Sequence, residues 1–309
     1  MISKTLRASY LVAACAVTVS TFAVSTVAQA SSKRSHPAPF SIRLEDQYLA
    51  TLRYLPVTFV ATVRATTPTT TTTTTTVPPT TTTTLIPTTS TSTTTTTTAA
   101  PPSTTTTTTK TPPSVKYATK VIPGNFVWRF TNLTALRPQW QVGTNNVLLQ
   151  GALMRFQYVH NLTTTGQMDG TTWQMLTSAI VAHQADPNPY DYVYVTKNLP
   201  ETVTLYQNGK SIFHTLANTG VSSAPTENGT YPVYLRFTVT TMSGTYPGGG
   251  TYSDPGIPWV SYFHGGDALH GFIRSGYGYP QSLGCVEMPF ADAAVLWPRT
   301  PIGTLVTVQ

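Results

Sequence analysis

Short apolar runs that alternate with turn residues dominate the last third of the chain. These runs are rich in Val, Tyr and Thr, and they cover residues 192–195, 202–206, 212–216, 231–239 and 305–308. Turn pairs such as Asn208-Gly209 separate them, which is typical of antiparallel hairpins. The pattern predicts a β-sandwich of about 120 residues. Helical periodicity in this part is confined to roughly 290–297.

A different periodicity precedes this β-rich part. Apolar side chains recur at helical spacing across 147–159 and again across 173–180, with Gly166 and Gly170 between the two stretches. Far upstream, within residues 41–60, a further set of apolar side chains lies near one helical face, and Pro56 ends this pattern. The set consists of Ile42, Leu44, Leu49, Leu52 and Leu55. The spacing predicts three short helices, of which the first is distant in sequence from the other two.

The first thirty residues have the form of a secretion signal. Lys4 and Arg7 precede an apolar run that ends in small residues at Ala28-Gln29-Ala30. We expect cleavage after Ala30 and a secreted protein of the cell wall or periplasm. Retention as a membrane anchor is the alternative, but Ser and Thr dilute the run, so no stable membrane span is expected in the mature chain.

Threonine dominates the segment between the first helix and the other two. Residues 61–110 hold 31 Thr, interspersed with Pro, and only Arg64 and Lys110 are charged. Such a segment cannot form a core and is expected to be disordered. It is either a stalk, with O-glycosylation as one possibility, or an insertion within a domain that residues 41–60 begin.

Net charge and cysteine content limit which partners and which cysteine chemistry are expected. The chain has 309 residues, a net charge of +7 and no cluster of Lys and Arg, which argues against nucleic acid as a partner and leaves an anionic polymer possible. Removal of the leader also removes Cys15, so Cys285 is the single remaining thiol and no intrachain disulfide is expected.

The densest group of reactive residues lies in 262–289. It contains Cys285, two imidazoles at His264 and His270, and Gly284 directly before the thiol. An imidazole can deprotonate a thiol, and backbone amides beside glycine can stabilise an oxyanion. This combination indicates nucleophilic acyl transfer. A zinc site formed by His264, Asp267, His270 and Cys285 is a less favoured alternative.

This region resembles the YkuD-type L,D-transpeptidase family. The resemblance rests on His270-Gly271, on Ser282-Leu283-Gly284-Cys285, and on landmarks spread across 190–309 such as the turn at 225–231. It implies that Cys285 is the nucleophile and His270 the base, with the Gly271 carbonyl orienting the imidazole. The Gly284 and Cys285 amides would then form the oxyanion hole.

The remaining site residues are expected to bind substrate or to support the loop. They are Ser282, which would brace the loop, His264 and Tyr262 at the pocket wall, and Arg274. The chain departs from the family at Leu283 and at Glu287, where Arg or Asn is usual. Glu287 puts anion recognition in doubt, because a carboxylate cannot bind another carboxylate, and we expect Arg274 or Arg236 to compensate.

The resemblance implies a thioester with peptidoglycan tetrapeptide stems, release of D-Ala, and transfer to a diaminopimelate amine in a 3→3 crosslink. No cofactor and no metal are implied. The alternatives are an L,D-carboxypeptidase, a variant that attaches proteins to the wall through the same site, and a noncatalytic wall-binding protein.

The helical stretch resembles the peptidoglycan-binding type 1 domain at Phe156-Gln157, Leu162, residues 166–170 and 172–176, and more weakly at 52–55. This implies contact with cell-wall glycan, whereas a small bundle that only packs on its neighbour is the alternative.

We therefore expect a multidomain α+β protein with a mainly-β catalytic sandwich. Its parts would be a signal peptide (1–30), a short helical segment (31–63), a disordered Thr/Pro-rich linker or insertion (64–115), a helical domain (116–187) and a catalytic domain (188–309).

Overall fold

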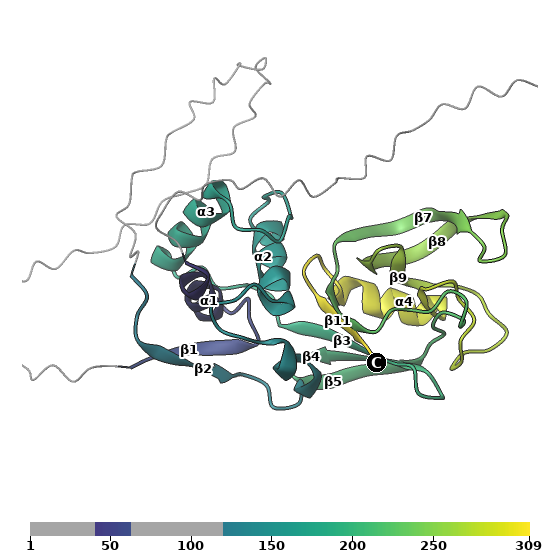
Figure 1. Cartoon of the computed structure of the whole chain (residues 1–309), viewed down its shortest axis with the longest axis horizontal. Coiled ribbons are helices and arrows are strands. Elements are labelled where there is room, and N and C mark those ends of the chain that lie inside the picture. The colour runs from purple at the N-terminus through teal and green to yellow at the C-terminus, as the bar shows by residue number, and fades with distance from the viewer. Residues whose placement is uncertain (1–40, 63–119) are drawn as a thin grey trace, which may run out of the picture. The chain divides into compact units, whose positions relative to one another are not determined.

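The computed structural model describes residues 41–62 and 120–309 (Figure 1). The expected signal peptide and nearly all of the Thr-rich segment lie outside these residues. These described residues all belong to one compact unit. Within 41–62 and 120–309, no helix has the length and apolar character needed to span a bilayer.

Helices α1 (Ile42–Thr51), α2 (Val147–Val159) and α3 (Gly170–Val181) pack together around one apolar core. Each begins at a polar cap whose side-chain oxygen accepts a backbone N–H of the first turn, at Ser41, Asn146 and Asp169. The core cluster joins residues from all three helices, among them Leu44, Leu49, Leu52, Leu153, Phe156 and Leu176. The apolar face expected for residues 41–60 thus packs against the other two helices.

A two-stranded antiparallel sheet follows α1, and the sequence pattern did not predict it. Strand β1 (Val57–Ala61) pairs with β2 (Gly124–Trp128), with Ala61 opposite Gly124. The Thr62 amide donates to the Pro123 carbonyl at 2.9 Å. Although they are 61 positions apart in the sequence, Thr62 and Pro123 are therefore neighbours in space.

The first sheet of the C-terminal part has the strand order β5-β4-β3-β11-β6. Its members are β3 (Asp191–Thr196), β4 (Thr202–Gln207), β5 (Lys210–Leu216), β6 (Gly229–Pro232) and β11 (Leu305–Val308). Strands β3 and β11 are parallel, and the other pairs are antiparallel. Four of the five runs that the alternation pattern predicted are strands of this sheet.

The second sheet has the order β10-β9-β8-β7. It contains β7 (Leu235–Thr245), β8 (Thr251–His264), β9 (Asp267–Gly271) and β10 (Val286–Met288). The expected single strand over 231–239 is wrong, because it is divided between the two sheets. The Val233 amide still bonds to Thr304 beside the first sheet, whereas the next amide, that of Tyr234, bonds to Tyr262 on β8.

The two sheets share one core, to which a helix also contributes. Val193 and Leu205 from the first sheet belong to the same buried cluster as Leu269 and Val286 from the second. Helix α4 (Phe290–Leu296), which continues into the 3-10 helix η2 (Trp297–Arg299), adds Ala293 and Leu296. Figure 1 shows α4 between the sheets. This part of the chain is mainly β, as expected, with a short helix at the predicted position.

Candidate active site

Two parallel strands bring the expected nucleophile and base to one cavity. His270 lies on β9, and Cys285 directly precedes β10, where Glu287 pairs with His270 in parallel register. Because side chains on a strand alternate between its faces, Cys285 and Glu287 share a face with His270. All three line a cavity of about 420 Å³. Much of the remaining lining comes from the β7–β8 hairpin through Met242, Ser243, Tyr246, Tyr252, Asp254, Ile257 and Tyr262.

The thiol is neutral in this setting. The Cys285 Sγ donates to the Gly266 carbonyl at 3.7 Å, in the turn between β8 and β9. Burial raises the pKa of the thiol to about 12, and the carboxylates of Asp267 and Glu287 act in the same direction. The Ala268 backbone amide opposes them by donating to the sulfur. The thiol therefore keeps its proton at neutral pH until a base removes it.

His270 has the tautomer that a general base requires. The residue is 3% exposed, and Nδ1 lies 3.0 Å from the Gly271 carbonyl oxygen. A carbonyl can only accept, so Nδ1 carries the hydrogen and Nε2 is left with a free lone pair. Burial lowers the pKa of the imidazole, and the Gly271 carbonyl and the Glu287 carboxylate counteract this in part. The resting pair is thus a neutral thiol and a neutral imidazole.

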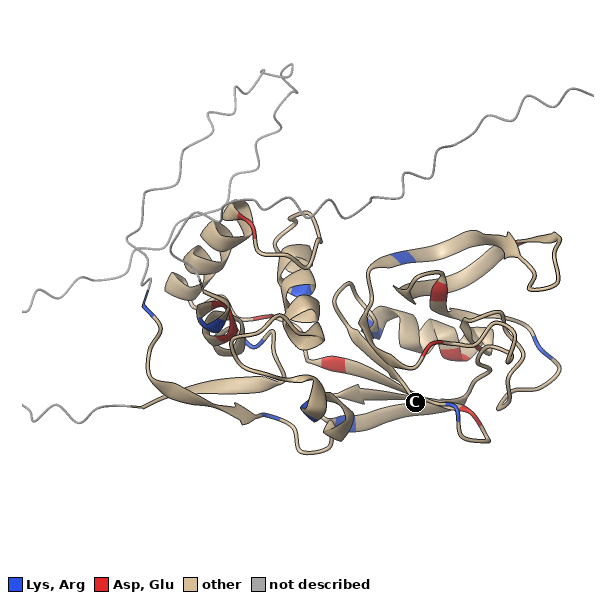
Figure 2. Cartoon of the chain, in the orientation of Figure 1, with Lys and Arg blue, Asp and Glu red and all other residues tan. Residues whose placement is uncertain are grey.

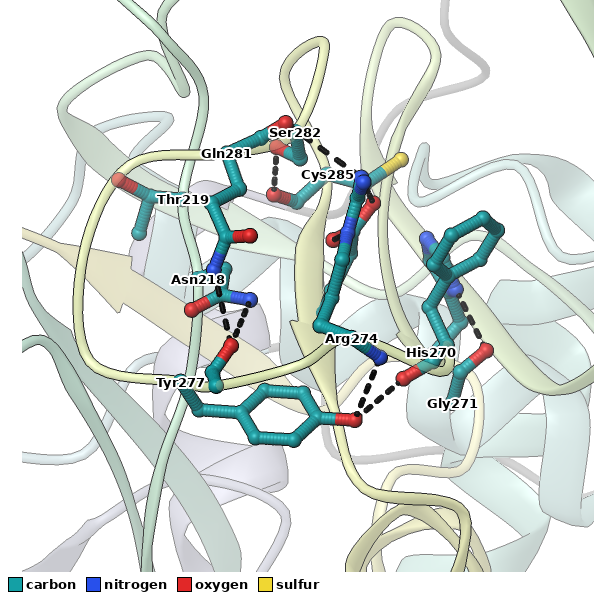
Figure 3. Close-up of polar contacts among 12 residues, drawn as sticks. Asn218, Thr219, His270, Gly271, Arg274, Tyr277, Gln281, Ser282 and Cys285 are labelled. Carbon is teal, nitrogen blue, oxygen red and sulfur yellow. Dashed lines mark hydrogen bonds and ion pairs between the residues drawn. The ribbon is translucent and has the colours of Figure 1, made fainter.

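Hydrogen bonds fix the loop that carries the thiol. The Ser282 hydroxyl donates to the Cys285 carbonyl at 2.6 Å and accepts the Gly284 amide at 3.2 Å. The expected oxyanion donor at Gly284 is therefore engaged with Ser282 in this structure. Figure 3 shows Ser282 beside Cys285 at the end of the loop.

Residues outside the nucleophile loop also hold it in place through hydrogen bonds. The Thr219 carbonyl accepts the amides of Gln281 and Ser282, and the Thr226 hydroxyl donates to the Gly284 carbonyl at 2.7 Å. The carboxylate of Glu201, which is 1% exposed, accepts both the amide and the hydroxyl of Thr219. Sequence reasoning missed these supporting residues.

Gly284 occupies a position that no other residue fits easily. Its φ of +113° lies in the region that disfavours residues with a Cβ. A Cβ placed there would lie 2.3 Å from Oδ1 of Asp267. Asp267, the first residue of β9, therefore packs directly against the backbone of the nucleophile loop.

Arg274 neutralises the unusual carboxylate at Glu287. Its guanidinium forms a two-pronged ion pair, with Nε 2.7 Å from Oε2 and Nη2 2.8 Å from Oε1 of Glu287. It also lies over the Phe272 ring, 4.6 Å from the centroid. Arg236 is engaged elsewhere, over the ring of Trp297 at 3.9 Å. Of the two candidate arginines, only Arg274 pairs with Glu287.

The second histidine lies outside the cavity wall. His264 stacks on Tyr231, with ring centroids 4.2 Å apart, and its Nδ1 is 3.7 Å from Asp267 Oδ2. Tyr262, by contrast, does line the cavity. Among the residues that the structure describes, no group of three or more His, Cys, Asp or Glu has the geometry to hold a metal ion.

One family model matches the C-terminal part of the chain. Residues 191–308 match the model of the YkuD family, described as the L,D-transpeptidase catalytic domain. No curated protein matches the chain.

Several solved structures are similar. An L,D-transpeptidase from Mycobacterium smegmatis is 19% identical over 39% of this chain and 59% of its own, with a TM-score of 0.35. The catalytic domain of an E. faecium L,D-transpeptidase is 24% identical over 38% of this chain and 95% of its own, with a TM-score of 0.36. This chain thus spans about three fifths of the mycobacterial protein.

Proposed function

We propose that this chain, whose residues 191–308 form a YkuD L,D-transpeptidase catalytic domain, is an exported cysteine acyltransferase that crosslinks peptidoglycan stem peptides. One observation carries the proposal. Cys285 and His270 line the same cavity from neighbouring parallel strands, with the free Nε2 lone pair of His270 available to accept the thiol proton. A thiol and a base held in this way can acylate without a metal or cofactor.

The first step would form a thioester. As Sγ of Cys285 attacks the carbonyl carbon between diaminopimelate and the terminal D-Ala, its proton passes to Nε2 of His270. The carbonyl oxygen becomes an oxyanion, for which the Cys285 amide is the expected donor, joined by the Gly284 amide if that amide leaves Ser282. The C–N bond then breaks, and the imidazolium returns the proton to the amine of D-Ala.

The second step would reverse the roles. A diaminopimelate side-chain amine of another stem attacks the thioester, His270 takes a proton from it, and Sγ leaves and regains a proton. The product is a 3→3 amide crosslink. Because the energy of the broken amide is kept in the thioester, no nucleotide is consumed.

Among the described residues, Arg274 is the single Lys or Arg that lines the cavity, where it lies among the carboxylates of Asp254 and Glu287. Arg274 lines the cavity with its side chain 29% exposed, so its outer N–H groups remain near the substrate even though it is paired with Glu287. We assign to Arg274 the recognition of a stem carboxylate, with Tyr262 as the wall beside it. Glu287 would then hold the guanidinium in place.

Export and wall binding complete the proposal. The leader-like residues 1–30 support secretion to the cell wall or periplasm, where the substrate is found. The resemblance of the helices to a peptidoglycan-binding type 1 domain supports contact with wall glycan, and the shared core of α1, α2 and α3 is compatible with it.

Mass spectrometry of the mature chain mixed with tetrapeptide muropeptides tests the proposal. We expect an adduct on Cys285, release of D-Ala and a crosslinked dimer, and we expect Cys285→Ala to lose all three while it remains folded by circular dichroism. D-Ala release with addition of water instead of dimer formation would identify an L,D-carboxypeptidase. Turnover by Cys285→Ala near the wild-type rate would refute the thiol mechanism.

A further inference from the structure

A second hollow, larger than the cavity of Cys285, lies on another part of the molecule. It has a volume of about 1080 Å³ and is lined by the end of α2, the start of β3, one residue of β7 and the segment around η2. None of its lining residues also lines the cavity of Cys285. We call it the α2–η2 groove.

The groove is cationic. Arg155, Arg236 and Arg299 line it, and Asp191 is its single lining carboxylate. Arg155 pairs with Asp186 at 3.1 Å, but neither Arg236 nor Arg299 makes an ion pair within residues 41–62 and 120–309. Arg236 Nε is buried without a hydrogen-bond acceptor. Figure 2 shows basic positions on both α2 and β7.

The groove is also firmly built. The Arg236 guanidinium lies over the Trp297 ring and donates to the Trp297 carbonyl, and Trp297 Nε1 donates to the Val260 carbonyl at 3.2 Å. On the α2 side, Tyr158 is 44% exposed. Guanidinium groups recognise carboxylates, and an exposed aromatic ring gives a flat apolar surface on which a sugar ring can stack.

We propose that the α2–η2 groove binds a peptidoglycan strand through the carboxylates of its stem peptides. This inference rests on the proposed function, because it takes peptidoglycan as the substrate. The volume is at the upper end for small-molecule pockets, and the cations are spread over α2, β7 and η2, which favours an extended polymer over one small anion. A strand held here raises the concentration of its stems near Cys285.

Retention on purified peptidoglycan sacculi measures this binding. All variants carry Cys285→Ala, so covalent capture cannot contribute. We expect Arg299→Glu to weaken binding at least ~10-fold, since one charge reversal removes an attraction and adds a repulsion, and Tyr158→Ala to weaken it about 3-fold. Lys210→Glu, an equal charge change on the exposed strand β5, is the matched control and should bind like its parent.

Retention of Arg299→Glu equal to its parent, or an equal loss in Lys210→Glu, would overturn the proposal. Sacculi stripped of phosphodiester-linked polymers should retain the protein; loss of binding after stripping would assign the groove to a phosphate polymer and overturn it too. A separate measurement tests the proposed function. With Cys285 intact, Arg299→Glu should form the acyl-enzyme on a soluble tetrapeptide at the rate of the wild-type chain. If the wild-type chain itself forms no acyl-enzyme, the proposed acyl-transfer chemistry is refuted. Retention on sacculi would then still decide whether the groove binds peptidoglycan.

Discussion

Glu287 lies directly opposite His270 across the parallel pair of β9 and β10. This relationship places a carboxylate on the same face as the base and the thiol, where it opposes thiolate formation. The Arg274 ion pair neutralises that carboxylate. The site therefore combines an acidic residue next to the nucleophile with a cation that lines the same cavity.

The two histidines should respond differently to substitution. His270→Ala removes the base and should slow acylation of Cys285 by ~10²-fold or more, whereas His264→Ala removes a ring that stacks outside the cavity and should change the rate only slightly. Acyl-enzyme formation followed by mass spectrometry gives both rates. Added imidazole should restore part of the activity of His270→Ala, and a reversed ranking of the two variants would identify His264 as the base.

Replacement of Gly284 should distort the nucleophile loop. Gly284→Ala places a Cβ against Asp267 Oδ1 and imposes an unfavourable φ, which costs about 1–2 kcal/mol for the backbone alone. We expect a lower melting temperature and a large loss of acylation. The double variant Gly284→Ala/Asp267→Ala removes the clash but keeps the unfavourable φ, so it should recover part of the stability. No recovery would show that the close approach to Asp267 is unimportant.

Removal of Arg274 and removal of Glu287 should lower the free energy of unfolding by different amounts. The Glu287 side chain is 6% exposed and that of Arg274 is 29% exposed, so Arg274→Ala leaves a buried carboxylate while Glu287→Ala leaves a cation that reaches water. We expect Arg274→Ala to be the more destabilising in urea unfolding. The double variant should cost less than the sum, by about 1–2 kcal/mol. Additive costs would mean that the pair contributes no coupling.

The pH dependence of acylation should reflect a neutral resting pair. Burial lowers the pKa of His270 from 6.5, so the free base dominates at neutral pH, and the rate should fall only as pH drops through a midpoint below 6.5. Burial raises the pKa of Cys285 to about 12, so alkylation by iodoacetamide should keep accelerating far above pH 9. An alkylation midpoint below pH 7 would instead indicate a preformed thiolate.

The N-terminal segment and the Thr-rich segment should differ in their effect on stability. Deletion of residues 41–60 removes α1 and its apolar contacts and should lower the melting temperature, whereas deletion of 70–108 removes no residue of the described core. Loop-closure entropy changes by only about 0.6 kcal/mol per doubling of length. Thermal melts compare both with the full mature chain, and an unchanged melt after deletion of 41–60 would contradict the packing of α1 against α2 and α3.

Sequence reasoning succeeded where the signal is local. The alternation across 192–195 and 202–206 and the helical spacing across 147–159 each lie within one element, so they indicated β3, β4 and α2 directly. Cys285 and His270 were recognised because their neighbours Gly284 and Gly271 form short motifs. The structure places both in one cavity.

Elements whose position depends on a hydrogen-bonding partner far away in the sequence could not be predicted. Strand β1 is short and pairs with β2, which lies beyond the whole Thr-rich segment. The division of 231–239 into β6 and β7 depends on bonds to Thr304 and Tyr262. Likewise, nothing near Thr219 in the sequence indicates that its carbonyl holds Gln281 and Ser282, and only the geometry chooses Arg274 over Arg236 as the partner of Glu287.

The hydrogen bond from Thr62 to Pro123 has a consequence for the length of the Thr-rich segment between them. The described residues that flank that segment, Thr62 and Pro123, lie side by side at the end of the paired strands β1 and β2. The distance between the helices and Cys285 is therefore independent of how many threonines the segment contains. A gain or loss of threonines should therefore leave the pairing of β1 with β2 and the alignment of the catalytic site unaltered.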